Sequence, residues 1–155
     1  MANTQAMTTS FKVDLFNAVH AFNATGIPAH TISTADVFKA ALFTAASSLG
    51  AATTSYTGAT TEVSGSGYSS GGVVVTFGTA PSSSGTTSFL TPSASITYTT
   101  VTLSTSFDCM LLYNNTNAGK NSVAVYTFTA QTVAAGTFSL TMPTNDASTG
   151  LLRIA

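Results

Sequence analysis

Apolar and polar residues alternate along several short segments of this chain. Along residues 122–130, Val123 and Val125 point to one face of an extended strand, and Tyr126 and Phe128 point to the other. The same alternation predicts strands at residues 95–103 and 137–142, and a β-branched run and an apolar run predict strands at residues 73–79 and 108–113. Short alternating strands separated by turns are typical of antiparallel sheets that bury one face. The sequence therefore predicts a mainly β protein, an antiparallel β-sandwich, and leaves a jelly roll open beside simpler topologies.

The beginning of the chain has helical spacing instead. Phe11, Leu15 and Phe22 fall on one face of a helix, at intervals of four and seven residues. A glycine and a proline follow shortly afterwards, and both residue types end helices. We expect one short helix at residues 10–22, after an N-terminal arm of residues 1–9.

Residues 36–44 fit two kinds of element. In a strand, Phe38, Ala40 and Leu42 share one face and Lys39 lies on the other, whereas in a helix the apolar residues at 37, 41 and 45 align. The remaining segments are rich in turn and loop residues. They are residues 47–56, with one helical turn, the glycine-rich residues 62–72, and residues 80–87, 114–121 and 135–136.

Charged residues are rare in this chain. They make up 6% of its 155 residues, against about 25% in typical domains, and Ser and Thr take much of their place. The length fits a single sandwich domain, residues 1–155. The net charge is −1, with four basic residues: Lys12, Lys39, Lys120 and Arg153. So few cations argue against nucleic-acid and membrane-surface partners. Weak charge repulsion between copies favours a homo-oligomer, a dimer or a trimer.

Targeting and redox signals are few. Cys109 is the single cysteine, which excludes a disulfide within the chain. No apolar run is long enough to span a membrane, and the first residues lack the pattern of a signal peptide. We therefore expect synthesis and folding in a cytoplasm.

Candidate chemical groups are scattered along the sequence. His20 and His30 stand ten residues apart without clustered partners, and Asp146 with Asn145 would make a poor calcium site. Cys109 lies in an apolar segment and is read as a buried small hydrophobe. No nucleophile has a base beside it and no pair of carboxylates is marked, so we predict no catalytic, cofactor-binding or metal site and no enzyme activity.

The glycines at 65, 67, 71 and 72 do not follow the spacing of a phosphate-binding loop. Turns or bulges in which the backbone takes a positive φ are the better interpretation. Five tyrosines could form a sugar-binding platform if they were exposed together, although the sequence does not place them so: Tyr56, Tyr68, Tyr98, Tyr113 and Tyr126.

Several segments together resemble a family of small virion structural proteins of tailed bacteriophages, the head decoration proteins. The most specific is Glu62-Val63-Ser64-Gly65-Ser66-Gly67-Tyr68. The others follow in the family's order: residues 10–12 and 14–17, 38–43, 71–73, 109–114, 122–128, and 136–138 running to 151–154. Residues 24–35 depart from the pattern as an insertion before the first strand. The resemblance favours a strand at residues 38–43.

This resemblance implies a capsid decoration or cement protein on the virion, made in the host bacterial cytoplasm. Its partners would be the major capsid protein and copies of itself, with no cofactor. The alternative is a tail or fibre component that binds the host surface, which exposed tyrosine clusters in the loops at residues 56–68 or 114–120 would favour. An enzyme such as a cell-wall hydrolase would need a cleft with two carboxylates. We expect the N-terminal helix or the preceding arm of residues 1–9 to reach a neighbouring subunit.

Overall fold

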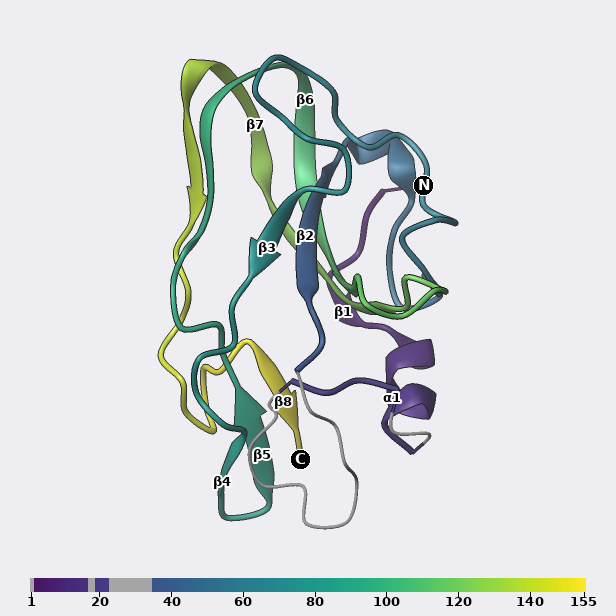
Figure 1. Ribbon diagram of the computed structural model, residues 1–155, viewed down its shortest axis with the longest axis vertical. Coiled ribbons are helices and arrows are strands. Elements are labelled where there is room, and N and C mark those ends of the chain that lie inside the picture. Colours follow the sequence, from purple (N-terminus) through teal and green to yellow (C-terminus); the bar gives the residue numbers. More distant parts are fainter. Residues whose placement is uncertain (1, 17–18, 23–34) are drawn as a thin grey trace.

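The computed structural model describes residues 2–16, 19–22 and 35–155 (Figure 1). These residues form two antiparallel sheets and one short α-helix, which confirms the predicted β-sandwich. In chain order the elements are β1 (Ala6–Met7), α1 (Thr9–Phe16), β2 (Phe38–Phe43), the 3₁₀ turn η1 (Ala45–Ser47), β3 (Val73–Val75), β4 (Ser82–Ser84), β5 (Thr87–Leu90), β6 (Ile96–Asn114), β7 (Ser122–Leu140) and β8 (Leu152–Ile154).

The larger sheet has five strands in the order β1-β7-β6-β2-β3, and the smaller has three in the order β4-β5-β8. Consecutive strands pair within the same sheet, β2 with β3 and β6 with β7. A jelly roll instead folds eight strands as two Greek keys across two sheets. The described strands therefore form a simpler sandwich, and the jelly-roll option is not the topology observed.

Two strands are much longer than the sequence suggested. Strands β6 and β7 each run for 19 residues, so the segments predicted separately at 95–103 and 108–113, and at 122–130 and 137–142, are continuous. The predicted turn at residues 135–136 lies inside β7, where Ala135 has a φ of 48° and the pairing with β6 shifts register. A turn-forming residue within a long strand is accommodated as a bulge, which the sequence alone does not distinguish from a chain reversal.

A second bulge changes which faces the valines of β7 occupy. Leu112 pairs with Ala124 and Tyr113 pairs with Ser122, so Val123 is the extra residue. Val123 and Val125, which strict alternation places on one face, consequently lie in different core clusters.

The segment predicted as a surface loop at residues 80–87 is largely a hairpin. Ser84 of β4 pairs with Thr87 of β5, which leaves a two-residue turn. Gly85 has a φ of 58° in that turn, the backbone conformation that glycine adopts without a steric penalty. Most of these residues are small and polar, so the sequence lacks the apolar alternation from which strands are predicted.

The helix is shorter than the predicted residues 10–22. It ends at Phe16, and residues 19–22 are not helical. There the Asp36 carboxylate accepts the Ala21 N–H at 2.8 Å, a contact from a distant segment that replaces a helical hydrogen bond. Of the predicted insertion at residues 24–35, residues 24–34 lie outside the described part.

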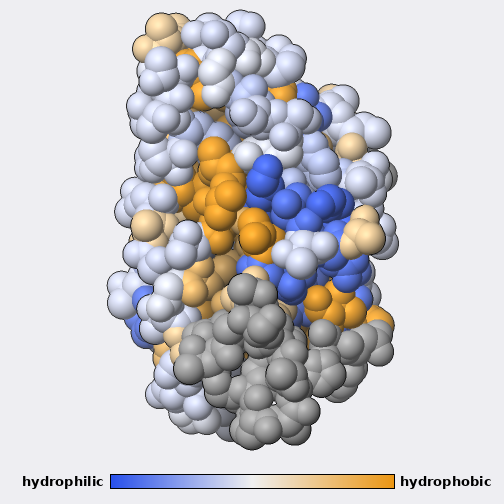
Figure 2. Space-filling view, viewed as in Figure 1, coloured by the Kyte–Doolittle hydropathy of each residue, from blue (hydrophilic) through white to orange (hydrophobic). Residues whose placement is uncertain are grey.

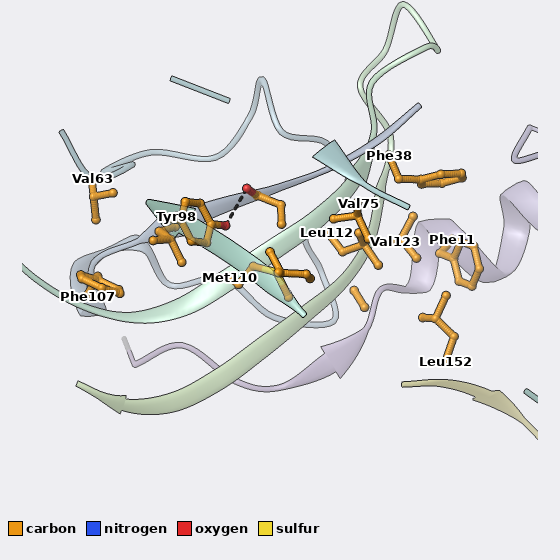
Figure 3. Close-up of a cluster of buried hydrophobic side chains, with 14 of the residues drawn as sticks. Phe11, Phe38, Val63, Val75, Tyr98, Phe107, Met110, Leu112, Val123 and Leu152 are labelled. Atoms are coloured by element: carbon orange, nitrogen blue, oxygen red, sulfur yellow. Dashed lines mark hydrogen bonds between the residues drawn. The ribbon is translucent and has the colours of Figure 1, made fainter. Parts of the chain in front are cut away.

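The strand prediction for residues 36–44 is confirmed by β2. One face of the large sheet packs with the small sheet and α1 to form the main core, in which Phe38 and Leu152 are buried (Figure 3). Leu42 is buried in the same core. Buried tyrosines usually find a hydrogen-bond partner, and the Tyr98 hydroxyl donates to the Ala40 carbonyl at 2.7 Å.

The expectation that each sheet buries a single face is wrong for the centre of the large sheet. Phe43, Cys109 and Leu111 are fully buried on its other face. The connection between β2 and β3 covers this face with Leu49 and Tyr56. Loop coverage thus gives the central strands two buried faces, which explains the continuous apolar run in the second half of β6.

Candidate functional site

No metal centre is found in the described part of the chain. None of its His, Cys, Asp and Glu residues form a group of three or more that could hold an ion. His30 lies outside the described residues. No described helix is long and apolar enough to cross a membrane.

Cys109 is buried in β6, as predicted. Its thiol faces the Phe43 carbonyl, with 3.8 Å between Sγ and O. Burial, together with the neighbouring Asp108, raises the pKa of the Cys109 thiol to about 12. A thiol that stays protonated and inaccessible is a poor nucleophile.

The Asp146 carboxylate is occupied by its own turn. Its Oδ1 accepts the backbone N–H groups of Ser148 and Thr149, both at 2.7 Å, and its Oδ2 accepts the Thr149 hydroxyl at 3.0 Å. These hydrogen bonds hold the pKa of Asp146 below its ordinary value. The group weighed as a calcium ligand therefore closes a surface turn.

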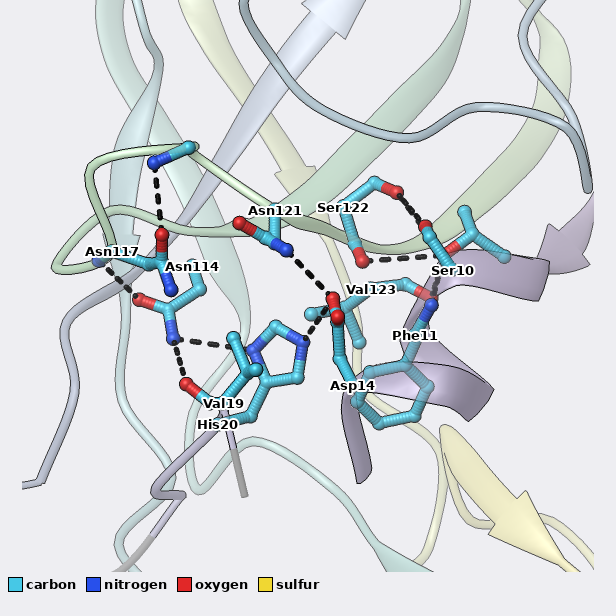
Figure 4. A network of polar contacts seen from close by, with 12 residues as sticks. Ser10, Phe11, Asp14, Val19, His20, Asn114, Asn117, Asn121, Ser122 and Val123 are labelled. Atoms are coloured by element: carbon cyan, nitrogen blue, oxygen red, sulfur yellow. Dashed lines mark hydrogen bonds and ion pairs between the residues drawn. The ribbon is translucent and has the colours of Figure 1, made fainter. Parts of the chain in front are cut away.

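His20 belongs to a polar network between α1 and the β6–β7 turn (Figure 4). Its Nε2 lies 3.4 Å from Asp14 Oδ2, and its Nδ1 lies 3.2 Å from the Asn114 amide nitrogen. The same Asn114 nitrogen donates to Asp36 at 2.7 Å, and the Asn121 amide donates to Asp14 at 2.8 Å. Both ring nitrogens of His20 face these groups. The network ties four chain segments together and presents no nucleophile to the histidine.

A second polar centre surrounds Glu62 on the connection between β2 and β3. Its carboxylate accepts four hydrogen bonds: from the Tyr56 hydroxyl at 2.7 Å, the Tyr68 hydroxyl at 2.8 Å, Ser70 Oγ at 3.0 Å and the Gly71 N–H at 2.7 Å. One acidic residue thus organises the loop that covers the large sheet. Sequence reasoning did not identify this role, although Glu62 opens the most specific segment of the resemblance.

The glycines of this connection have the predicted conformation. Gly67, Gly71 and Gly72 all have positive φ. Gly65 is required for another reason, because a Cβ there would lie 2.0 Å from the Thr102 carbonyl oxygen. The segment crosses β6 at this point, where Ser66 and Thr102 form a β-bridge. These glycines let two backbones approach closely and do not form a phosphate site.

The tyrosines do not gather on an exposed platform. The buried Tyr113 donates to the Gly71 carbonyl at 2.9 Å, and Tyr126 donates to the Leu151 carbonyl at 3.0 Å. The Tyr56 ring stacks on Tyr113, with centroids 4.5 Å apart. With the Tyr56 and Tyr68 hydroxyls engaged by Glu62, the aromatic residues are structural here.

The arm of residues 1–9, which we expected to reach a neighbour, lies on its own chain from Asn3 onward. Asn3 donates to Asp108 Oδ1 at 2.7 Å and accepts the Leu49 N–H at 2.7 Å. Strand β1 then pairs with β7, Ala6 opposite Val125. The arm therefore extends the large sheet within one molecule.

Open strand edges are the most prominent surface feature. In the described residues, β1 covers β7 at positions 124 and 125, and no strand covers the rest of that edge. Residues 129–132 are exposed, and residues 122–142 contain no charge and no proline. Natural proteins usually protect such edges with charges, prolines or short strands.

The opposite side of the large sheet carries exposed apolar side chains. On β3, Val74 is 60% exposed, and Val37, just before β2, is 42% exposed. Figure 2 shows apolar surface over β3 next to hydrophilic surface over the β6–β7 turn. The chain therefore offers several neutral surfaces on which another protein can pack.

Comparisons of the chain with models of protein families, with curated proteins and with solved structures give no match.

Proposed function

We propose that the protein is a non-enzymatic structural component of a tailed-bacteriophage virion, a capsid decoration or cement protein. It binds the outer surface of the shell formed by the major capsid protein and stabilises that shell. It assembles there with copies of itself, after synthesis in the host bacterial cytoplasm, and its function involves no nucleic acid or membrane.

The long, uncharged outer edge of β7 carries this proposal. An unprotected strand edge is a template for pairing with another chain, and its neutrality avoids the cost of desolvating charges. A capsid presents many symmetry-related copies of each contact, so weak edge contacts act together. The edge alone does not say which assembly the protein joins. The resemblance of the sequence to head decoration proteins indicates that this assembly is a phage capsid.

Electron cryo-microscopy of the particle that carries this protein tests the proposal. We expect density for it at regular positions over joints between capsid subunits. Density confined to the tail or to one vertex would replace the proposal with the tail or fibre alternative. Absence from purified particles would overturn both.

A matched pair of substitutions tests the edge itself. Ala130→Lys places a charge on the exposed part of β7, whereas Ala118→Lys places the same charge on the exposed β6–β7 turn. We expect the first variant to occupy capsids about tenfold less than wild type at limiting concentration and the second to bind normally. Equal occupancy of the two variants would contradict the role of β7.

A further inference from the structure

We propose that a groove between β1 and β8 binds an extended, acidic segment of the partner protein as an added strand. The inference deepens the proposed function and rests on it for the identity of the partner, the capsid shell protein. The chemistry of the segment follows from the groove itself.

The groove has two connected parts. One, of about 500 Å³, is lined by Met7, Lys12, Leu15, Arg153, Ile154 and Ala155. The second, of about 390 Å³, shares Met7, Arg153 and Ala155 with the first and continues toward Thr87 and Leu151. Each part has the size of an ordinary ligand site, and the shared residues join the two parts.

The edges of both sheets meet at this groove. Strand β1 is the last strand of the large sheet and β8 is the last strand of the small sheet, and among the described residues each has one strand partner. Beside β1, the Thr4 and Thr9 N–H groups donate to the Leu49 and Ala51 carbonyls. Met7 of β1 and Ile154 of β8 line the same part of the groove. An extended chain lying between them would find backbone donors and acceptors, as peptides do when they add to a sheet edge.

Apolar side chains form much of the lining. Leu15 on α1 is 39% exposed and Ile154 is 46% exposed, and both line the same part of the groove. A bound strand would cover both side chains. Its alternate residues should therefore be apolar where they face Leu15 and Ile154.

The charge of the groove selects an acidic occupant. Two of the four basic residues of the chain, Lys12 and Arg153, line it, and no Asp or Glu does so among the described residues. Lys12 is exposed and has no hydrogen bond or ion pair to a described residue. Arg153 donates to the Ala147 and Ser148 carbonyls and attracts Asp146, and its guanidinium has further donors.

The same charges argue against a second copy of this chain as the occupant. A two-fold symmetric contact would bring the groove against itself, and Lys12 and Arg153 would face their own counterparts. Two cations are also too few for nucleic acid. A carboxylate-bearing segment of a different protein would not repel Lys12 and Arg153, and two cations are enough to bind it.

Peptide binding to the full chain tests the proposal. The probe is an eight-residue peptide of alternating Val and Thr with an Asp near each end, and the control carries Lys in place of Asp. Amide chemical shifts are followed by nuclear magnetic resonance. We expect the acidic peptide to shift the amides of Met7, Arg153 and Ile154 and to bind about tenfold more tightly than the control. Equal affinities, or no saturable shift at millimolar peptide, would overturn the proposal.

Substitutions of Lys12 test whether its charge is responsible for the preference for the acidic peptide. Lys12→Gln should weaken binding of the acidic peptide about threefold and Lys12→Glu should abolish its advantage over the control. Lys39→Gln, which removes an equal charge from β2, should leave binding unchanged. If the groove amides instead shift with protein concentration in the absence of peptide, the occupant is a second copy and the proposal is wrong.

Capsid occupancy separates this inference from the proposed function. If the acidic peptide binds the groove while wild-type protein is absent from capsids, the cement function fails and the groove still selects acidic strands. If wild-type protein decorates capsids, Lys12→Glu decorates them equally and the peptides do not bind, the groove inference fails alone.

Discussion

The Nδ1 atom of His20 lies 3.2 Å from the amide nitrogen of Asn114, on the side of the ring opposite the Asp14 carboxylate, which lies 3.4 Å from Nε2. The Asn114 side-chain oxygen accepts the N–H groups of Thr116 and Asn117 at 2.9 and 3.2 Å, so the nitrogen must face His20. That nitrogen also donates to Asp36 Oδ2 at 2.7 Å and lies 3.3 Å from the Val19 carbonyl oxygen. It can donate to Nδ1 when the His20 ring is neutral.

Acid should therefore weaken the fold through His20. Burial lowers the pKa of His20 below 6.5, against the opposing pull of Asp14 and Asp36. Below the ordinary pKa of histidine the unfolded chain binds a proton more readily than the folded one. The stability from the neutral ring is thus complete above about pH 6.5 and is lost progressively as the pH falls below that value.

Urea unfolding at a series of pH values checks this dependence. The free energy of unfolding should fall less steeply with acid in His20→Gln than in wild type. An unchanged slope in His20→Gln would show that its titration is not linked to folding.

Removing the charge of Glu62 should destabilise the loop over the large sheet. In Glu62→Gln an NH2 group replaces one carboxylate oxygen. This group cannot accept the hydrogen bonds that the oxygen accepted, and we expect a loss of about 2 kcal/mol in the free energy of unfolding. Tyr56→Phe, which removes one of the four donors, should cost about 1 kcal/mol. Urea unfolding measures both values. A loss below about 0.5 kcal/mol for Glu62→Gln would contradict the central role of this carboxylate.

Two glycines with positive φ should respond differently to substitution by alanine. At Gly72 a Cβ would lie 1.7 Å from the Ala40 carbonyl oxygen, whereas at Gly85 the space within 4 Å is empty. Gly85→Ala should therefore cost about 1 kcal/mol, from backbone strain alone. Gly72→Ala should cost more than about 3 kcal/mol or prevent folding. Thermal unfolding compares them, and similar midpoints would disprove the close contact between Gly72 and β2.

The Cys109 thiol should not react in the folded protein. It is buried and its pKa is raised to about 12, so little thiolate is present at neutral pH. A chromogenic disulfide reagent should label it at the rate of unfolding, and at once in denaturant. Because the chain has a single cysteine, the signal needs no further assignment. Rapid labelling under native conditions would mean that the loop over Phe43 opens readily.

Local features of this protein were readable from the sequence because they depend on neighbouring residues. The Asn-rich turn at residues 114–121, the apolar face of Phe38 and Leu42, and the need for glycine at 71 and 72 follow from turn chemistry, alternation and backbone sterics. Low charge and a single buried cysteine were likewise evident before the fold was known.

Tertiary structure decided what depends on contacts between distant segments. Ala135 forms a bulge because β6 continues beside it, and the second face of the large sheet is buried because a loop crosses it. Glu62 became a hydrogen-bond centre when that loop brought four donors to one carboxylate. The groove joins Met7 to Arg153 from opposite ends of the chain. Contacts between residues so distant in sequence depend on how the sheets pack together. No local sequence pattern specifies that packing.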